Sequence, residues 1–387
     1  PVAVSKPEEV GLSADRLKRI NGLIQRRIDA GEISGAVTLV ARRGRVVHLE
    51  AQGLADIAAK KPMTRDAIFQ IASMTKPVTG AAIMMLVEEG KVRLSDPAWR
   101  YIPELRGLKV AVPIAGDAGT SGTTPKFSTV PADREITIQD LLTHTSGLVS
   151  GRISIAEVAK LPPLPTESLA KYIPRLGAVP LEFQPGSRWG YSSLGFDVLA
   201  RIVEVVSLQS YDQFLREHIF APLGMKDTTF FPLEALAGRR ATMYDQRDGK
   251  LQPRIVPCCR VGGSGGLFST IEDYWFFAQS LSNGGQFAGT RLLGPRTVDL
   301  MASPYAPDTL PGRYWQGQAF GLSMRVVTDR VKAGSPISDR SFGWNGAAGT
   351  HFWVDPKEKI VAILMVQTPI GELQRDFEQA VMQAVIE

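Results

Sequence analysis

The two ends of the chain carry matching patterns that limit the fold more than any other feature. After Ser13, apolar residues recur at helical spacing, which predicts an amphipathic helix over residues 14–30. Two β-rich runs follow, Ala36–Ala41 and Val46–Ala51. Near the other end, the apolar run KIVAILMVQ predicts a buried strand and LQRDFEQAVMQAVIE a closing helix. The simplest arrangement is a sheet assembled from both ends with helices against it, which makes the middle of the chain an insertion.

That middle, residues 69–239, has the pattern of helices joined by long irregular loops. Two loops are rich in residues that break regular structure, VPIAGDAGTSGTTPKFSTVPADRE and KLPPLPTES. Loops of this length inside a compact domain often bind ligands or cover a site. We therefore expect an α/β domain made of residues 1–68 and 240–387, a mainly helical domain of residues 69–239, and an active site at their interface.

The composition is that of a globular protein and argues against several functions. Of the 387 residues, 44% are hydrophobic and 21% charged, and the longest apolar runs are too short to span a bilayer. The formal charge of +5 comes from basic residues scattered among almost as many acidic ones, which argues against nucleic-acid binding. The cysteines, Cys258 and Cys259, are adjacent and fit neither a disulfide framework nor a metal cluster. We expect no cofactor and no metal.

The first residues, PVAVSKPEEVGLSADRL, are charged and lack an apolar signal core, so we expect a cytoplasmic protein. A periplasmic or secreted protein stays open, because the chain begins on Pro1 and a leader could have been removed. The sequence does not determine the oligomeric state.

Ser73 and Lys76 stand three residues apart in IASMTKPVTGAAIMMLVEEG, just ahead of a long apolar run. On a helix this spacing puts both side chains on one face, close enough for the amine to hydrogen-bond the hydroxyl. A helix N-terminus also favours the negative charge of an alkoxide or a developing oxyanion. The spacing alone is weak evidence, because Ser168 and Lys171 repeat it in PTESLAKYIPRLG, where a solvated short helix is the better interpretation.

Tyr191 supplies a possible third group. A serine activated by a lysine usually needs a partner that passes the proton to the leaving group, and a tyrosine phenol can do this if nearby cations lower its pKa. Of the eight tyrosines, only Tyr191 is followed two residues later by a small polar side chain, Ser193. The turn residues before it and the helical spacing after it place this Tyr-Ser-Ser unit on a loop. A tyrosine that only caps a helix entrance is the alternative.

Ser264 is a competing nucleophile, because GGSGG satisfies the G-x-S-x-G pattern of α/β-hydrolases and Asp339 and His351 follow in the matching order. An elbow serine leads straight into a helix, whereas the next helix here is predicted to start at Ser269, with a capping box to Glu272. We expect the glycines to let the backbone pack closely or to line a cleft. A structural role is the preferred interpretation for the other histidines, His48, His144 and His218.

Five short motifs then occur in the order expected of one superfamily: SMTK ahead of an apolar helix, LLTHTSGL, PGSRWGYSS, IFAPLGMKDT and FGWNGAAGTHFWVDP. Together they resemble the serine β-lactamase and penicillin-binding superfamily, and they are most similar to its class C β-lactamase-like carboxylesterases, the family VIII esterases. The resemblance runs from near Val10 to the end of the chain. It implies an α/β fold of the β-lactamase/D-alanyl-peptidase type, an antiparallel sheet flanked by helices plus an inserted, mainly helical domain.

The resemblance also implies the roles of individual residues. Ser73 would be the acylated nucleophile, with Lys76 and Tyr191 acting together as its base and as acid to the leaving group. The backbone N–H groups of Ser73 and Ala347 would form the oxyanion hole, because WNG aligns with the Lys-Thr-Gly element of the β-lactamases. The small residues from Gly346 onward suit such a strand edge, since an ester carbonyl can approach it.

Departures from the β-lactamase pattern bear on the substrate. Trp344 stands where a lysine would help hold the carboxylate of a β-lactam, and its neutral ring suits an uncharged acyl or alcohol portion. Ser193 replaces the usual asparagine, which in β-lactamases would bind the amide of the acyl side chain. Asn345 replaces the usual threonine or glycine. With Gly346 these are the expected substrate-binding residues, and they favour simple esters over penicillins.

We therefore expect a carboxylesterase that cleaves short-chain acyl or aryl esters through an acyl-enzyme on Ser73, with a small-molecule ester as its partner. Weak β-lactam hydrolysis stays open, because the nucleophile and the oxyanion hole are shared. A β-lactamase or a D-alanyl-D-alanine peptidase is the first alternative. A penicillin-recognition module without catalysis is an alternative of another class, and acyl transfer to a second alcohol also stays open.

Overall fold

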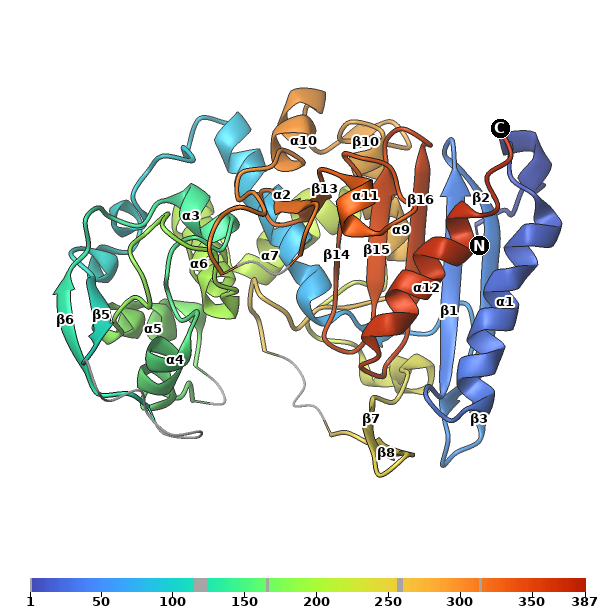
Figure 1. Ribbon diagram of the computed structural model, residues 1–387, viewed down its shortest axis with the longest axis horizontal. Coiled ribbons are helices and arrows are strands. Elements are labelled where there is room, and N and C mark those ends of the chain that lie inside the picture. The colour runs from blue at the N-terminus through green and yellow to red at the C-terminus, as the bar shows by residue number, and fades with distance from the viewer. Residues whose placement is uncertain (1, 115–123, 165–166, 256–259, 313–314) are drawn as a thin grey trace.

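The computed structural model describes residues 2–114, 124–164, 167–255, 260–312 and 315–387. Its largest element is an eight-stranded antiparallel sheet with strand order β12-β13-β14-β15-β16-β1-β2-β3, built from both ends of the chain (Figure 1). The predicted fold class is therefore confirmed. The strand bounds are β1 Gly35–Arg42, β2 Arg45–Asp56, β3 Lys61–Pro62, β12 Gln318–Phe320, β13 Arg325–Val327, β14 Phe342–Asn345, β15 His351–Asp355 and β16 Ile360–Met365.

The centre of this sheet is buried on both faces. Strands β1 and β16 pair antiparallel, with Val37 opposite Met365, and both strands are buried along their whole length. Because side chains of a strand alternate between faces, Val37 belongs to one hydrophobic core and its neighbour Ala36 to another. This double burial explains why the two strands appear in the sequence as continuous apolar runs.

Helices cover the two faces of the sheet. α1 (Ala14–Asp29) and α12 (Gly371–Met382) pack against each other on one face, and α9 (Ile271–Ser282) packs on the other (Figure 1). The predicted N-terminal helix is confirmed, because Ser13 accepts a hydrogen bond from the Arg16 N–H at 3.3 Å and so caps it. α9 corrects a prediction: it starts one residue after Thr270, which caps it by accepting from the Asp273 N–H, so the helix does not start at Ser269.

A second group of helices surrounds α2 (Thr75–Glu88), which runs through the middle of the molecule and packs against α6 (Ser193–Ser207) (Figure 1). α2 is apolar nearly all round, which is the pattern of a helix buried in a core. Next to these lie α3 Ile138–Leu142, α4 Arg152–Ala159 and α5 Leu169–Tyr172. The division into domains 1–68 with 240–387 and 69–239 stays a proposal.

One loop predicted to be irregular contains a β-hairpin. β5 (Lys109–Pro113) pairs antiparallel with β6 (Phe127–Pro131) on either side of residues that lie outside the described ranges. Its strands, KVAVP and FSTVP, have five residues each and end on proline, so no sustained alternation of apolar and polar residues marked them. Cys258 and Cys259 also lie outside the described residues.

The other elements are short. They are α7 Tyr211–Leu215, a π-helical turn Arg216–Phe220, α8 Ala221–Leu223, α10 Pro295–Met301, α11 Arg330–Ala333, and the strand pairs β4 Phe69–Gln70 with β9 Phe268–Ser269, β7 Tyr244–Arg247 with β8 Lys250–Pro253, and β10 Gln286–Phe287 with β11 Thr290–Arg291. Among the described residues, no helix is both long and apolar enough to cross a membrane.

Candidate active site

Ser73 lies in a single 3₁₀ turn, Ala72–Met74, that leads directly into α2. The residue before it, Ala72, has a φ of +45°, a left-handed backbone conformation that costs a non-glycine residue free energy of about 1–2 kcal/mol. The surrounding structure holds this turn, because the Ile71 N–H donates to the Leu267 carbonyl at 3.0 Å and Thr350 Oγ1 donates to the Ile71 carbonyl at 3.3 Å. The hydroxyl is thereby presented at the start of a buried helix.

Two side chains meet the Ser73 hydroxyl. Lys76 Nζ donates to Ser73 Oγ at 3.0 Å, and the Tyr191 hydroxyl lies 2.8 Å from the same oxygen. The Lys76 amine also lies 4.9 Å from the centroid of the Tyr191 ring. Lys76 is fully buried, and in the described part of the chain its amine forms no ion pair; it donates instead to the Ser264 carbonyl at 2.7 Å. A serine hydroxyl in contact with both an amine and a phenol has two neighbouring groups through which its proton can move, as a serine nucleophile needs.

His144 holds Tyr191 in place. The N–H of Gly190 donates to the His144 carbonyl at 2.9 Å, and the N–H of Ser192 donates to His144 Nδ1 at 3.1 Å, so both neighbours of Tyr191 are bound. The His144 ring centroid lies 4.6 Å from that of Tyr191. Because Nδ1 accepts a hydrogen bond, the ring is the neutral form with its proton on Nε2. The structural role preferred for this histidine agrees with these contacts.

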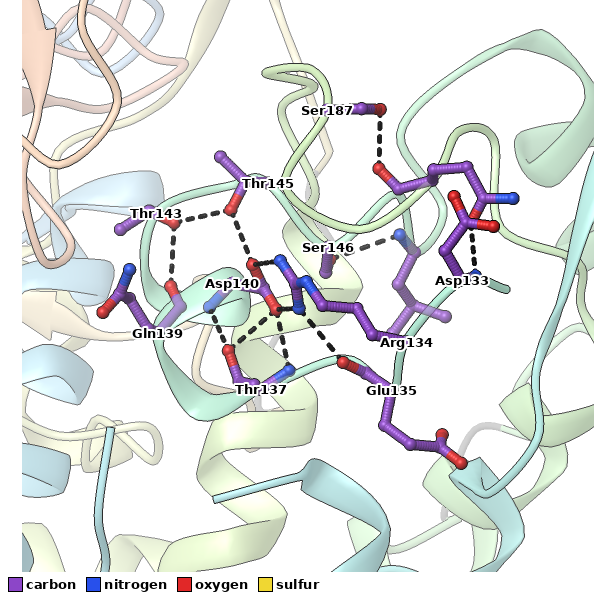
Figure 2. Close-up of polar contacts among 12 residues, drawn as sticks. Asp133, Arg134, Glu135, Thr137, Gln139, Asp140, Thr143, Thr145, Ser146 and Ser187 are labelled. Carbon is purple, nitrogen blue, oxygen red and sulfur yellow. Dashed lines mark hydrogen bonds and ion pairs between the residues drawn. The ribbon is translucent and has the colours of Figure 1, made fainter. Parts of the chain in front are cut away.

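A polar network around Asp140 reaches Thr143 and Thr145 (Figure 2). The residue between these two threonines, His144, has a φ of +59°. Asp140 accepts from the Thr137 N–H at 2.9 Å in the capping box of α3, and it pairs with Arg134. The same carboxylate accepts from Thr145 Oγ1 at 3.1 Å, one residue beyond His144. The sequence predicts a structural role for His144 within LLTHTSGL, and this network fixes the turn from which His144 bonds both neighbours of Tyr191.

The strand β14 brings the predicted substrate-binding residues to the same region. Trp344 is buried, and its ring stacks on that of Tyr191 with the centroids 6.1 Å apart. The same ring makes edge-to-face contacts with Phe320 and Trp315. Asn345 points away, since its amide donates to Gln374 of α12 at 2.9 Å. The Trp344 side chain can therefore form a wall of the site. The Asn345 side chain is instead bound to a helix on the other face of the sheet.

Gly346 and Ala347 follow at the end of β14. A Cβ at Gly346 would lie only 2.5 Å from the Ile71 carbonyl, so glycine is needed for the strand to approach the turn that carries Ser73. Ala347 is exposed in the next turn, and its N–H donates to no acceptor within the described residues. Ser193 is also exposed and is the first residue of α6, while Ser192 is its buried N-cap.

A cavity of about 630 Å³ opens beside Tyr191. Its wall is formed by the ends of the β5–β6 hairpin, the start of α4 and the segment before Tyr191. The apolar and aromatic members of this wall are Pro113, Pro125, Ile153, Phe183 and Trp189. Three charged side chains, Arg152, Glu182 and Arg188, also line it, so the cavity is apolar only in part.

The competing serines have other surroundings. The Ser264 N–H donates to Asp197, whereas His351 bonds to Glu378 at 3.0 Å in the buried interior and Asp339 is an exposed acceptor for the Arg330 N–H. The described residues therefore contain no Ser264–His351–Asp339 triad. Ser168 and Lys171, at the short helix α5, are both exposed, as the solvated interpretation expects.

The chain matches the family model described as Beta-lactamase over residues 20–384. It is 39% identical over 360 residues to Protein Rv1367c of Mycobacterium tuberculosis, covering 88% of this chain and 87% of that protein. It is 29% identical over 402 residues to Esterase EstB of Burkholderia gladioli, covering 96% of each. Among solved structures, EstCE1, a hydrolase with promiscuous acyltransferase activity, superposes with a TM-score of 0.80 at 26% identity over 95% of this chain and 99% of its own.

Fold and site together define a hydrolase of the serine β-lactamase fold, with its sheet built from both chain ends and its serine at the start of a buried helix. The chain belongs to the β-lactamase family. The resemblance to the serine β-lactamase superfamily, inferred from the five motifs, is therefore confirmed.

Proposed function

We propose that this protein is a carboxylesterase that acts through an acyl-enzyme on Ser73. The observation that carries the proposal is the position of Ser73 Oγ, 3.0 Å from Lys76 Nζ and 2.8 Å from the Tyr191 hydroxyl. No histidine takes part in this arrangement, because His144 bonds to the backbone beside Tyr191. The reaction therefore uses a lysine and a tyrosine where many serine hydrolases use a histidine.

The steps follow from these contacts. The Lys76–Tyr191 pair takes the proton of Ser73 as its oxygen attacks the ester carbonyl carbon. The oxygen of that carbonyl becomes an oxyanion, for which the N–H groups of Ser73 and Ala347 are the proposed donors; losing one such donor typically costs about 2.7–4 kcal/mol. The pair then gives the proton to the departing alcohol oxygen. Water repeats the sequence on the acyl-enzyme and releases the carboxylic acid.

The walls of the site favour neutral esters. Trp344 and Trp189 are uncharged aromatic side chains next to Tyr191, with ring centroids 6.1 Å and 6.3 Å from it. The adjoining cavity has room for an aryl or short acyl group. The esterase EstB and the hydrolase EstCE1 are similar over nearly the whole chain, which supports an ester over a β-lactam. We expect kcat/KM for an aryl acetate to exceed that for a chromogenic cephalosporin.

Acyl transfer to an added alcohol is a second candidate, because the same acyl-enzyme serves both reactions and the similar structure EstCE1 is described as having this activity. Its signature is a new ester formed from an aryl acetate when an alcohol is added, at the expense of free acetate.

The nucleophile is tested by substitution and by trapping. Ser73→Ala should abolish turnover of a short-chain aryl ester, whereas Ser168→Ala, at the exposed copy of the same spacing, should leave it unchanged. Mass spectrometry after reaction with an organophosphonate should place the adduct on the peptide that contains Ser73. An adduct on Ser264, or full activity in Ser73→Ala, would show the proposal to be wrong.

A further inference from the structure

The glycine-rich segment 262–266 meets the reacting groups through its backbone. Lys76 Nζ donates to the Ser264 carbonyl at 2.7 Å as well as to Ser73 Oγ. Two acceptors at fixed positions determine the direction of an otherwise freely rotating amine with three donors. The position of the Ser264 carbonyl therefore helps decide whether the amine points at Ser73.

The peptide just before that carbonyl is held at both of its polar atoms. Its carbonyl, on Gly263, accepts from Thr79 Oγ1 at 2.7 Å, and its N–H, on Ser264, donates to Asp197 Oδ1 at 3.0 Å. Thr79 lies on α2 three residues after Lys76, and Asp197 lies on α6 six residues after Tyr191. The helix that carries Lys76, α2, and the helix that begins two residues after Tyr191, α6, thus also clamp this peptide.

The Thr79 hydroxyl contacts three groups. The Tyr211 hydroxyl lies 2.6 Å from Thr79 Oγ1, and burial raises the pKa of Tyr211, so the phenol keeps its proton and can donate it to Thr79. The Thr79 hydrogen then has two carbonyls within reach, that of Gly263 at 2.7 Å and that of Thr75 at 3.2 Å, and the shorter contact is the one to Gly263. All three side chains are buried, Asp197 with 5% of its surface exposed and Thr79 with none.

The close approach of Asp197 requires glycine opposite it. A Cβ at Gly262 would lie 2.8 Å from Asp197 Oδ1, and one at Gly263 would lie 2.1 Å from the Phe196 carbonyl. The GGSGG sequence, which formally matches a nucleophile elbow, has here a packing function, as we predicted for its glycines. Ser264 contacts Lys76 through its backbone carbonyl.

Asp197 can accept the Ser264 N–H in either protonation state. Burial raises the pKa of its carboxyl, while the hydrogen bonds of Ser264 and the charges of Arg260 and Lys76 act in the opposite direction. Arg260 and Gln70 share a cavity of about 160 Å³ with Asp197, and Tyr211 also lies near it. Because a neutral carboxyl and a carboxylate both have an acceptor oxygen, the contact does not depend on charge.

We propose that Asp197 is a positioning residue for the Ser73 reaction: by holding the Gly263–Ser264 peptide, it places the carbonyl that aims the Lys76 amine at Ser73 Oγ. This inference rests on the proposed function. Asp197 bonds the Ser264 N–H and has no contact with Ser73 among the described residues, so we expect it to act on the rate of acylation and not on the affinity for the ester.

The first test compares two substitutions with aryl acetate as substrate. Asp197→Ala should lower kcat by about 10- to 100-fold, the scale expected when a reacting group is misplaced by a fraction of an ångström to one ångström, with KM nearly unchanged. Asp197→Asn should keep kcat within about threefold, because its amide oxygen still accepts the Ser264 N–H. The rate of phosphonate labelling of Ser73 should follow kcat in both variants.

The second test changes the contact to the carbonyl of the same peptide, on Gly263. It can be read even if Asp197→Ala does not fold. Thr79→Val removes the donor to Gly263 and should lower kcat, whereas Thr79→Ser keeps the hydroxyl and should restore it. The double variant Asp197→Ala/Thr79→Val should lose little more than the worse single variant, because both act on one peptide.

Asp273→Ala is the matched control, a truncation of another buried carboxyl, whose partners are the Asp227 N–H and Thr228. It should lower the melting temperature and leave kcat of the folded protein unchanged. The inference is overturned if folded Asp197→Ala keeps kcat within twofold of wild type, or if Asp197→Asn loses as much as Asp197→Ala. Failure of the proposed function is a different outcome, in which the wild-type protein neither hydrolyses esters nor is labelled at Ser73.

Discussion

At the scale of single residues, Ser73 depends on two partners that reach it in different ways. Lys76 is three residues away on the same helical segment, whereas Tyr191 is 118 residues away and is positioned by His144. The ring of Tyr191 packs between His144 and Trp344, and its hydroxyl alone contacts Ser73. Ring and hydroxyl can therefore be separated by substitution.

Tyr191→Phe should lower kcat for an aryl ester by about 10²- to 10⁴-fold, the usual contribution of a proton-transfer group, with little change in KM. The reason is that phenylalanine keeps the packing against His144 and Trp344 and loses only the hydroxyl. Tyr101→Phe is the control, because the Tyr101 hydroxyl donates to Asp96 at 2.6 Å, outside the site. Steady-state kinetics of the two variants at pH 7 measures this, and a Tyr191→Phe enzyme with wild-type kcat would contradict the assigned role.

At the scale of elements, the end of β14 is fastened to the turn before α2. Thr350 Oγ1 donates to the Ile71 carbonyl, and the Gly346 N–H donates to the Thr350 carbonyl at 2.8 Å. A side chain at Gly346 has no space, since its Cβ would lie 2.1 Å from Thr350 Oγ1. The end of β14 can therefore approach Ser73 this closely only because residue 346 is glycine.

Gly346→Ala should push the strand end away from Ser73 and with it the N–H of Ala347. We expect kcat to fall toward the loss of about 10²- to 10³-fold known for removal of an oxyanion donor. Gly371→Ala, at the start of α12 where an added Cβ meets open space, should be neutral. Equal kcat values for the two variants, measured on the same aryl ester, would argue against Ala347 as a donor.

At the scale of the whole molecule, hydrogen bonds join the first and last segments of the chain beside the sheet. Arg42 donates to the carbonyls of Val10 and Gly11 and to the terminal Glu387, and Leu12 bridges to Val385. The first and last segments therefore share one hydrophobic core on the outer face of the sheet. A change in the stability of this sheet is expected to affect the entire protein.

Acid should destabilise the molecule through His48 on β2. Burial, together with the charge of Arg65, lowers the pKa of His48 to about 4, against about 6.5 in an unfolded chain. Stability is thus lost as the pH falls below 6.5, because His48 then binds a proton in the unfolded chain and stays neutral in the folded protein. Between pH 7 and pH 4 this amounts to about 3 kcal/mol.

Urea unfolding at both pH values tests this for wild type and His48→Gln, which stays neutral and keeps a side chain that can bond Thr38. The variant should lose about 3 kcal/mol less than wild type over this range. Carboxylates titrate equally in both proteins, so they cancel in the comparison. An identical pH dependence in the two proteins would contradict the burial argument.

Much of the fold could be predicted because its signals are local. The helix after Ser13 and the apolar runs at β1 and β16 follow from periodicity, and the spacing of Ser73 and Lys76 is itself a helical contact. The β5–β6 hairpin was missed because its five-residue strands carry no sustained apolar alternation. The N-cap of α9 was placed one residue early, at Ser269, because Ser269 and Thr270 are both residue types that cap helices.

The sequence by itself determined the identity and order of the groups proposed to react: a serine and a lysine one helical turn apart, a later tyrosine, and a run of small residues near the C-terminus. Only the tertiary structure decided that the Tyr191 hydroxyl meets Ser73 and that Asp197 and Thr79 clamp the peptide beside Lys76. The physical reason is separation along the chain. Spacing fixes contacts within one helical turn, whereas contacts between α2, α6 and the glycine segment arise only when buried side chains and close backbone approaches are satisfied together.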